Sequence, residues 1–275
     1  MAERIAKVIA RAGLCSRREA ETLIAAGRVC LDGETVESPA TTVGPESEIT
    51  VDGVVVPGAA PPRLWLFHKP AGLLTTERDP QGRRTIYDIL PDDLPRVMPV
   101  GRLDLNSEGL LLLTNDGAVK RRLELPSTGW RRRYRVRVHG RPDAKLLKRL
   151  SRGIVIDGIE YQPIAAKLDS QAGVNAWLTM TLTEGKNREI RKVCEHLGLR
   201  VNRLIRIAFG PFQLGKLPAG ALKEVPGKVL REQLGTTAQE TSAAAPARKP
   251  HVRTDESRPQ IRPAADGVGH EGRRR

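Results

Sequence analysis

The residues most able to do chemistry lie in the stretch PVGRLDLNSEGLLLLTNDG (99–117). Gly101 permits a sharp turn, and Arg102 and Asp104 then stand in a loop before an apolar strand expected at 110–114. A carboxylate held at a strand end beside an arginine can act as a nucleophile or as a general base. A loop aspartate is also a common turn former or helix cap, so this spacing alone leaves both roles open.

The second candidate is Tyr134, which stands in the arginine-rich segment RRRYRVRV (131–138). The chain has only three Phe, three Trp and three Tyr, so a tyrosine among arginines is a good candidate for stacking on a nucleobase. Strand alternation also places Val136 and Val138 on the same face as Tyr134, which predicts that its side chain is partly buried. The pattern is therefore compatible with a stacking residue and with a core residue.

A third group of candidates lies in LTEGKNREIRKVCEHLG (182–198), where the apolar periodicity predicts a helix over 187–197. Arg191 lies beside the apolar face of this helix, and a cation there can keep a partly buried aspartate ionised. Lys186 and Arg188 lie near the helix start, where they suit phosphate groups. The spacing is equally compatible with both arginines binding phosphate.

The cysteines and histidines show no spacing that suits a metal. Cys15, Cys30 and Cys194 are isolated, and an odd number without a motif argues against a disulfide framework and against a zinc site. A metal-dependent nuclease would need clustered carboxylates, and the adjacent pair Asp92 and Asp93 lies near a proline-rich turn. We therefore expect no metal and no cofactor, and activity in excess chelator would test the nuclease alternative.

Positive charge is concentrated in the middle of the chain. The net charge is +14 and the isoelectric point is near 10.2. Residues 61–234 hold thirty-two Lys and Arg against eighteen Asp and Glu, whereas residues 1–60 hold six against nine. Such an excess favours a polyanionic partner, usually nucleic acid, although a solvated basic surface would give the same count. Because the chain has no long apolar run and no secretory segment, we expect a cytoplasmic protein that does not use a membrane.

The elements that must position these residues begin with two short helices. The apolar spacing predicts one helix over 3–13 and a second helix from Ser16, which forms a capping box with Glu19, to about Ala26. Short strands follow, with two Asp-Gly turns between them, at 29–31, 35–36, 49–51 and 54–56.

Basic residues on these two helices are candidate RNA contacts. Arg17 and Arg18 lie in the first turn of the second helix, where the helix dipole disfavours cations, so a phosphate partner would explain their position. The complete set of candidates is Arg4, Lys7, Arg11, Arg17 and Arg18.

The composition divides the chain into four parts. Residues 1–58 form the small helical and stranded module, and residues 59–62 lie in a Pro- and Gly-rich linker. Residues 63–234 carry the catalytic candidates. Residues 235–275 hold four Pro, four Gly and almost no large apolar side chain, so we expect a disordered basic tail.

The central part alternates strands with short helices, which predicts an α+β domain on a mixed, mainly antiparallel sheet. The expected strands are 64–67, 97–100, 110–114, 133–139, 164–168, 176–183 and 201–207. The expected helices are 85–89, 117–123, 143–151 and 187–197.

Two resemblances cover most of the chain. The stretch RAGLCSRREAETLIAAGRVCLDGETV, within roughly residues 3–50, resembles the RNA-binding module first described in ribosomal protein S-four. The ordered series HKPAGLLTTERDPQGRRTIYDILP, GRLDLNSEGLLLLTNDG, RRRYRVRV, LTEGKNREIRKVCEHLG and VNRLIRIAFGPFQLGKLPAG closely resembles the pseudouridine synthases of the RsuA/RluB type. These enzymes join an S-four-like module to a catalytic domain built on a mixed, largely antiparallel sheet.

The resemblance implies roles for individual residues. Asp104 matches the essential aspartate of the family, and Tyr134 matches the tyrosine that stacks on the target base and is proposed as a base. Arg191 matches the basic residue that pairs with the aspartate, and Leu204 matches an apolar residue lining the uracil pocket. Arg102 flanks the nucleophile. Many relatives have Lys or Glu near the tyrosine, whereas this chain has Trp-Arg-Arg-Arg at 130–133, which puts the RNA contacts there in doubt.

The expected function is the isomerisation of uridine to pseudouridine in ribosomal RNA, by a monomer without a cofactor. The stretches SRREAETLIAAGRV and VNRLIRIAFG look more like the branch acting on large-subunit (23S) ribosomal RNA, free or in a pre-ribosomal particle, than like the small-subunit branch. A non-catalytic RNA-binding protein of ribosome assembly is the alternative. Such a binder has no need of Asp104 and Tyr134, so those residues distinguish the two.

Overall fold

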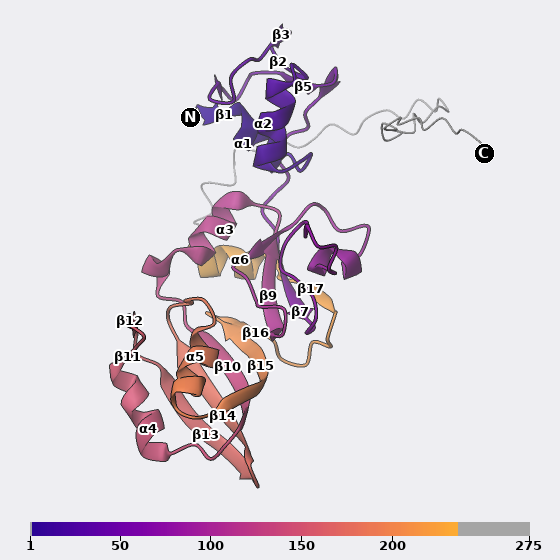
Figure 1. Ribbon diagram of the computed structural model, residues 1–275. Helices are drawn as coiled ribbons and strands as arrows, with labels where there is room; N and C mark the ends of the chain where they lie inside the picture. The colour runs from indigo at the N-terminus through magenta and orange to yellow at the C-terminus, as the bar shows by residue number, and fades with distance from the viewer. Residues whose placement is uncertain (1, 236–275) are drawn as a thin grey trace, which may run out of the picture. The chain divides into compact units, whose positions relative to one another are not determined.

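The computed structural model describes residues 2–235 (Figure 1). The tail predicted over 235–275 lies, from residue 236 onward, outside the described residues. No helix within residues 2–235 is long and apolar enough to cross a lipid bilayer.

The N-terminal module has two helices and short strands. Helix α1 spans Ile5–Arg11 and helix α2 spans Arg17–Ala25, and the predicted capping box between Ser16 and Glu19 is present. The helix predicted from residue 3 begins later, because Glu3 and Arg4 pair as strand β1 with β4 (Thr42–Val43). The other strands form one sheet in the order β3-β2-β5-β6, with bounds Glu34–Thr35, Val29–Leu31, Ile49–Val51 and Val54–Val55.

The central part is built on one large sheet, with strand order β13-β14-β10-β15-β9-β7-β17. Its strands are β7 (Leu64–Lys69), β9 (Glu108–Thr114), β10 (Arg132–His139), β13 (Ala165–Ala172), β14 (Asn175–Leu182), β15 (Arg200–Phe209) and β17 (Leu222–Glu224), extended by β8 (Met98–Val100) and β16 (Phe212–Gln213). All neighbouring pairs are antiparallel except β15 and β9, which are parallel. The predicted α+β class and the mixed, mainly antiparallel sheet are confirmed.

Helices cover the two faces of this sheet in different places. Helices α4 (Ala144–Arg149) and α5 (Glu189–His196) bury apolar side chains with the inward residues of β10 and β14, and Figure 1 shows α5 lying over these strands. Helices α3 (Gly117–Glu124) and α6 (Gly227–Leu234) pack instead with β9 and β7, on Leu110, Leu112 and Leu64. Alternate residues of β9 therefore enter different cores, which explains its continuous apolar run.

Several short elements differ from the sequence prediction. The helix expected at 85–89 is a 3-10 turn over Ile86–Ile89, capped by Thr85. The pattern did not predict the hairpin β11–β12 (Ile154–Ile156 and Ile159–Tyr161), because three-residue strands give too few alternations to recognise. The remaining 3-10 turns are Pro126–Thr128 and Leu150–Arg152.

Candidate functional site

A cleft of about 1190 Å³ opens on the face of the sheet that carries Tyr134. Its walls come from segments far apart in the sequence: the loop after β8, strands β10 and β15, and the segment from β14 into α5. The cleft brings together six of the residues singled out from the sequence, namely Arg102, Asp104, Tyr134, Lys186, Arg188 and Leu204.

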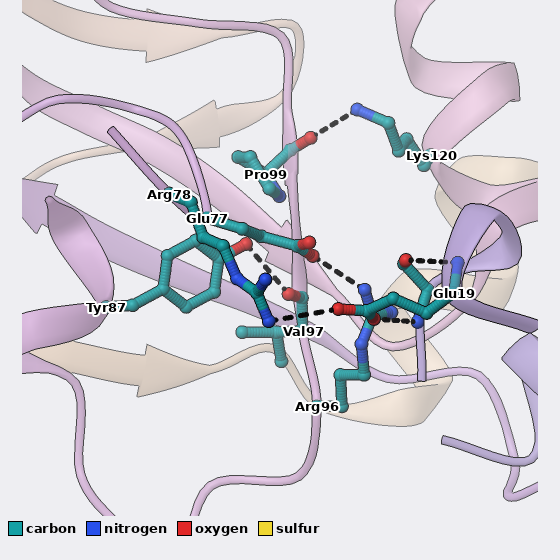
Figure 2. Close-up of polar contacts among 9 residues, drawn as sticks. Glu19, Glu77, Arg78, Tyr87, Arg96, Val97, Pro99 and Lys120 are labelled. Carbon is teal, nitrogen blue, oxygen red and sulfur yellow. Dashed lines mark hydrogen bonds and ion pairs between the residues drawn. The ribbon is translucent and has the colours of Figure 1, made fainter. Parts of the chain in front are cut away.

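Polar contacts fix the chain on its way to Asp104 (Figure 2). Arg96 pairs with Glu77 at 2.6 Å, and the Tyr87 hydroxyl donates to the Val97 carbonyl at 3.1 Å. Lys120 of α3 then donates to the Pro99 carbonyl at 2.5 Å. Residues 96–99, which lead into the Asp104 loop, are thus held by Glu77 and Tyr87 and by Lys120 of α3.

The loop itself is held by a buried ammonium group that the sequence analysis did not single out. Lys69 ends β7 with 0% of its surface exposed, and its Nζ donates to the carbonyl oxygens of Ser107 at 2.9 Å and Asp104 at 3.3 Å. It also donates to the carbonyl oxygens of Pro70 at 3.0 Å and Leu105 at 3.4 Å. Burial lowers the pKa of Lys69 to about 8, and the charges of Asp104 and Glu108 oppose that shift. In the sequence, Lys69 is recognisable only as a charged residue at the end of a mainly apolar strand.

The Asp104 carboxylate faces the cleft, with 35% of its side chain exposed. Beneath it the Thr75 hydroxyl donates to the Leu103 carbonyl at 2.9 Å and accepts from the Leu103 amide at 3.3 Å. The backbone on either side is therefore fixed by Lys69 and Thr75, while the carboxylate itself accepts no hydrogen bond from residues 2–235 and has Arg188 at 3.9 Å. A reactive group held on a fixed backbone needs little reorganisation when it reacts.

Tyr134 and Leu204 lie on the adjacent strands β10 and β15 and form part of the cleft. Tyr134 is 9% exposed and belongs to the same core cluster as Val136 and Val138, which confirms the predicted burial, whereas its stacking on a nucleobase stays a prediction. Arg206 is paired with Tyr134 across the strands and is buried, and its Nε donates to the Leu110 carbonyl at 2.7 Å. The cleft floor thus combines an aromatic ring, an apolar side chain and a buried guanidinium.

The ion pair predicted between Asp104 and Arg191 is not the one that the described residues form. Arg188 Nη1 lies 3.9 Å from Asp104 Oδ2. Arg191 instead donates to two carbonyl oxygens, Asn106 at 3.0 Å and Val201 at 3.4 Å. Burial lowers the pKa of Arg191, the charge of Arg188 adds to this, and the charge of Asp104 opposes it.

The backbone explains this exchange of partners. Arg188 precedes α5 with φ of +53°, a left-handed conformation uncommon for a residue with a side chain, so it does not continue the helix. Arg191 lies in the first turn of α5, is half-buried and contacts the Asp104 loop at Asn106. Helical spacing could not show a turn of this kind.

Lys186 lines the cleft but is already neutralised within the chain. Its Nζ lies 2.6 Å from Glu184 Oε2 and donates to the Glu160 carbonyl at 2.7 Å. The Glu184 and Glu160 contacts hold the segment before α5, so the predicted phosphate role of Lys186 would require a partner that competes with them.

A buried carboxyl group also escaped the sequence analysis. Glu189 is 3% exposed, and its Oε2 accepts from the Lys186 amide at 3.0 Å while its own amide donates to the Lys186 carbonyl at 3.2 Å. These two bonds close the turn that contains Arg188. Burial raises the pKa of Glu189 to about 7, and the negative charge of Glu184 adds to the shift.

Glu189→Gln is expected to stabilise the protein at pH 8 by roughly 1–3 kcal/mol, and to change little at pH 4.5. The folded pKa lies above the ordinary value of 4.5, so the unfolded chain releases this proton first as pH rises. The destabilisation caused by the carboxyl group therefore grows as the pH rises from 4.5 to about 7, and it stays constant above pH 7. Urea unfolding at both pH values measures the effect. Glu195→Gln on the exposed side of α5 is the matched control, and equal gains from both variants would contradict the argument.

The basic residues of the N-terminal module lie outside the cleft. Lys7 and Arg11 each pair with Glu3 at 2.7 Å, and Arg17 lies 3.7 Å from Glu21. Arg4 and Arg18 are exposed, without an ion pair among residues 2–235. All five are available at the surface, with part of their charge offset locally.

Comparison with known proteins agrees with this arrangement. The family of RNA pseudouridylate synthases matches residues 63–196, and the S4 domain family matches residues 3–49. An uncharacterized RNA pseudouridine synthase of Rickettsia felis is 50% identical over 230 residues, covering 84% of this chain and 100% of that protein. The ribosomal large subunit pseudouridine synthase B of Salmonella typhi is 42% identical over 232 residues, covering 82% and 80%.

A solved structure is also similar. The crystal structure of a pseudouridylate synthase covers 84% of this chain and 99% of its own, with a TM-score of 0.59 and 26% identity. The order of the motifs, the cleft that gathers them and the extent of these similarities lead to one assignment: the chain belongs to the RNA pseudouridine synthases of the RsuA/RluB type.

Proposed function

We propose that this enzyme converts one uridine of large-subunit ribosomal RNA to pseudouridine, with Asp104 as the nucleophile. The observation that carries the proposal is the cleft, where the exposed carboxylate of Asp104 shares one space with Tyr134 and Leu204. The similarity to a ribosomal large subunit pseudouridine synthase supports the choice of RNA.

The chemistry requires only groups that the chain supplies. The N1–C1′ bond of uridine breaks, the uracil rotates, C5 bonds to C1′, and the proton on C5 moves to N1. The Asp104 carboxylate attacks C1′ as the N1–C1′ bond breaks and is displaced again when C5 bonds to C1′, or it assists loss of the uracilate without bonding; a general base then removes the C5 proton. Tyr134 holds the freed ring by stacking and is our candidate for that base. Atoms and electrons balance without an oxidant or a reductant.

A uridine in folded RNA must leave its stack to reach this cleft, and eversion costs a few kcal/mol. Arg102 and Arg188 lie at the cleft beside Asp104, where guanidinium groups can hold the flanking phosphates. Binding through phosphates releases counterions, so the affinity for RNA falls steeply with salt.

The arginines of α5 and its N-terminal turn divide two tasks in this proposal. Arg188 is the ion-pair partner of Asp104 in the free enzyme, at 3.9 Å, and can turn to a phosphate when RNA arrives. Arg191 holds the Asp104 loop through the Asn106 carbonyl. This assignment replaces the direct pairing of Asp104 and Arg191 expected from the sequence. The division at residues 58 and 62 and the monomeric state stay predictions.

Pseudouridine mapping tests the proposal directly. In ribosomal RNA from cells with and without the gene, we expect one pseudouridine of the large-subunit RNA to disappear and to return with the wild-type gene but not with Asp104→Asn. Loss of a site in the small-subunit RNA would overturn the choice of substrate. An unchanged map with altered ribosome assembly would favour a role in binding alone.

A further inference from the structure

The sheet of the catalytic part has a second basic surface, on the face opposite the cleft. Side chains along β10 alternate, so Tyr134 enters the core while Arg133, Arg135 and Arg137 are exposed on the other side. We call these three residues, with Lys167 of β13 and Trp177 of β14, the outer arginine face. Lys167 is exposed and Trp177 is partly buried.

Strand register places these side chains next to one another. Arg137 lies opposite Trp177, and Arg135 lies opposite Thr179, which in turn lies opposite Lys167 on β13. Residues directly opposite in an antiparallel pair project from the same face, with Cβ atoms about 5 Å apart. The three strands are hydrogen-bonded neighbours in the order β13, β14, β10, as Figure 1 shows, so the residues of the outer arginine face lie on adjacent strands.

The positive charges on this surface have no carboxylate partner among residues 2–235. Within residues 2–235, neither Arg135 nor Arg137 forms an ion pair, whereas Arg203 on β15 is held by Glu108 at 2.6 Å. The carboxylate of Asp169 reaches Thr179 rather than an arginine, at 2.7 Å. Arg133 donates to the neutral amide of Gln213 at 2.7 Å.

Arg135 is also positioned by an aromatic ring. Its guanidinium carbon lies 4.6 Å from the centroid of Trp177. Stacking of this kind holds the planar group while its N–H edges stay free for hydrogen bonds, and guanidinium edges match phosphate geometry. An exposed guanidinium positioned in this way, with further arginines beside it on the same strand, is suited to binding a polyanion.

From the charge, the spacing and the exposed stacked arginine, we infer that the outer arginine face binds the sugar–phosphate backbone of a second segment of the substrate RNA. The inference rests on the proposed ribosomal RNA function, because only a large RNA can occupy the cleft and reach the opposite face of the sheet. A minimal stem–loop held in the cleft leaves this surface empty. The surface then contributes affinity for long RNA and contributes nothing to the chemical step.

The double variant Arg135→Gln/Arg137→Gln tests the inference. On a naked full-length large-subunit transcript, we expect affinity to fall roughly tenfold and the slope of log K against log salt to become shallower by about 1.5. Single-turnover formation of pseudouridine in a minimal stem–loop should be unchanged. Lys148→Gln/Arg149→Gln on the exposed side of α4 removes the same charge elsewhere and is the matched control. Arg135→Lys/Arg137→Lys should restore most of the salt slope.

The outcomes separate cleanly once thermal melting shows that each variant is folded. Equal affinity of wild type and the Gln variant for the long transcript would overturn the inference, and so would an equal loss with the α4 control. A loss confined to protein-containing precursor particles would overturn it in favour of an acidic protein partner. If neither the wild type nor any variant modifies the stem–loop, the proposed function fails. The salt slopes on the transcript still decide whether the outer arginine face binds RNA.

Discussion

Asp104→Asn is expected to abolish pseudouridine formation at every pH, lowering the single-turnover rate by at least roughly 10⁴-fold. The amide of asparagine cannot attack C1′ or stabilise the charge that develops there, and no change of pH converts it to a carboxylate. The loop should keep its shape, because the hydrogen bonds from Lys69 and Thr75 go to backbone carbonyl oxygens and do not involve the Asp104 side chain.

The affinity of Asp104→Asn for RNA should stay near that of the wild type. A carboxylate repels phosphate, so its removal is not expected to weaken RNA binding. The measurement is single-turnover conversion with saturating RNA across pH, together with filter binding of the same RNA. Asp93→Asn, in an exposed loop, is the matched control and should be fully active. An Asp104→Asn enzyme that kept a tenth of the rate would exclude Asp104 as nucleophile.

The sequence was sufficient for the strands that carry the cleft, because each has a clear physical signal. β10 alternates arginine with apolar residues, and β9 contains the continuous apolar run Leu110–Leu113. Strand alternation correctly placed Tyr134 with Val136 and Val138 in the core. The membership of the family and the mixed sheet followed from the order of such segments.

The sequence was not sufficient for contacts that form only after folding. Lys69 is buried by four carbonyl groups from its own neighbour and from a loop more than thirty residues away. Glu189 reads as an ordinary first-turn acid, a common position at a helix start, yet it is buried. The partner of Asp104 depends on the backbone of Arg188, whose left-handed conformation has no pattern in the residue types.

Gly109→Ala is expected to be strongly damaging to both the stability and the activity of the enzyme. Gly109 has φ of +103°, and a Cβ there would lie 2.7 Å from the amide nitrogen of Arg206 and closer still to its carbonyl oxygen. Strain at such a φ costs about 1–3 kcal/mol by itself, and the backbone contact adds to it because no side chain can turn away.

The position of this contact makes its effect on activity larger than its effect on stability. Among the described strands, a single strand pairing links the half of the sheet with β10 to the half with β9: the parallel pair of β15 and β9, at Ile205 with Glu108 and Arg206 with Gly109. Asp104 precedes β9, whereas Tyr134 lies on β10. A Cβ at position 109 must push these halves apart, and misplacement by about 1 Å can cost 10²-fold in rate.

We therefore expect Gly109→Ala to lower the free energy of unfolding by about 3 kcal/mol or more, and the single-turnover rate by at least about 10²-fold at a temperature where the variant is still folded. Urea unfolding and single-turnover kinetics on the same preparations measure both. Gly117→Ala, at the start of α3, is the matched control, because Gly117 has an ordinary φ and open space where its Cβ would be. A Gly109→Ala protein as stable and as active as this control would show that the two halves of the sheet can separate without moving Asp104 away from Tyr134.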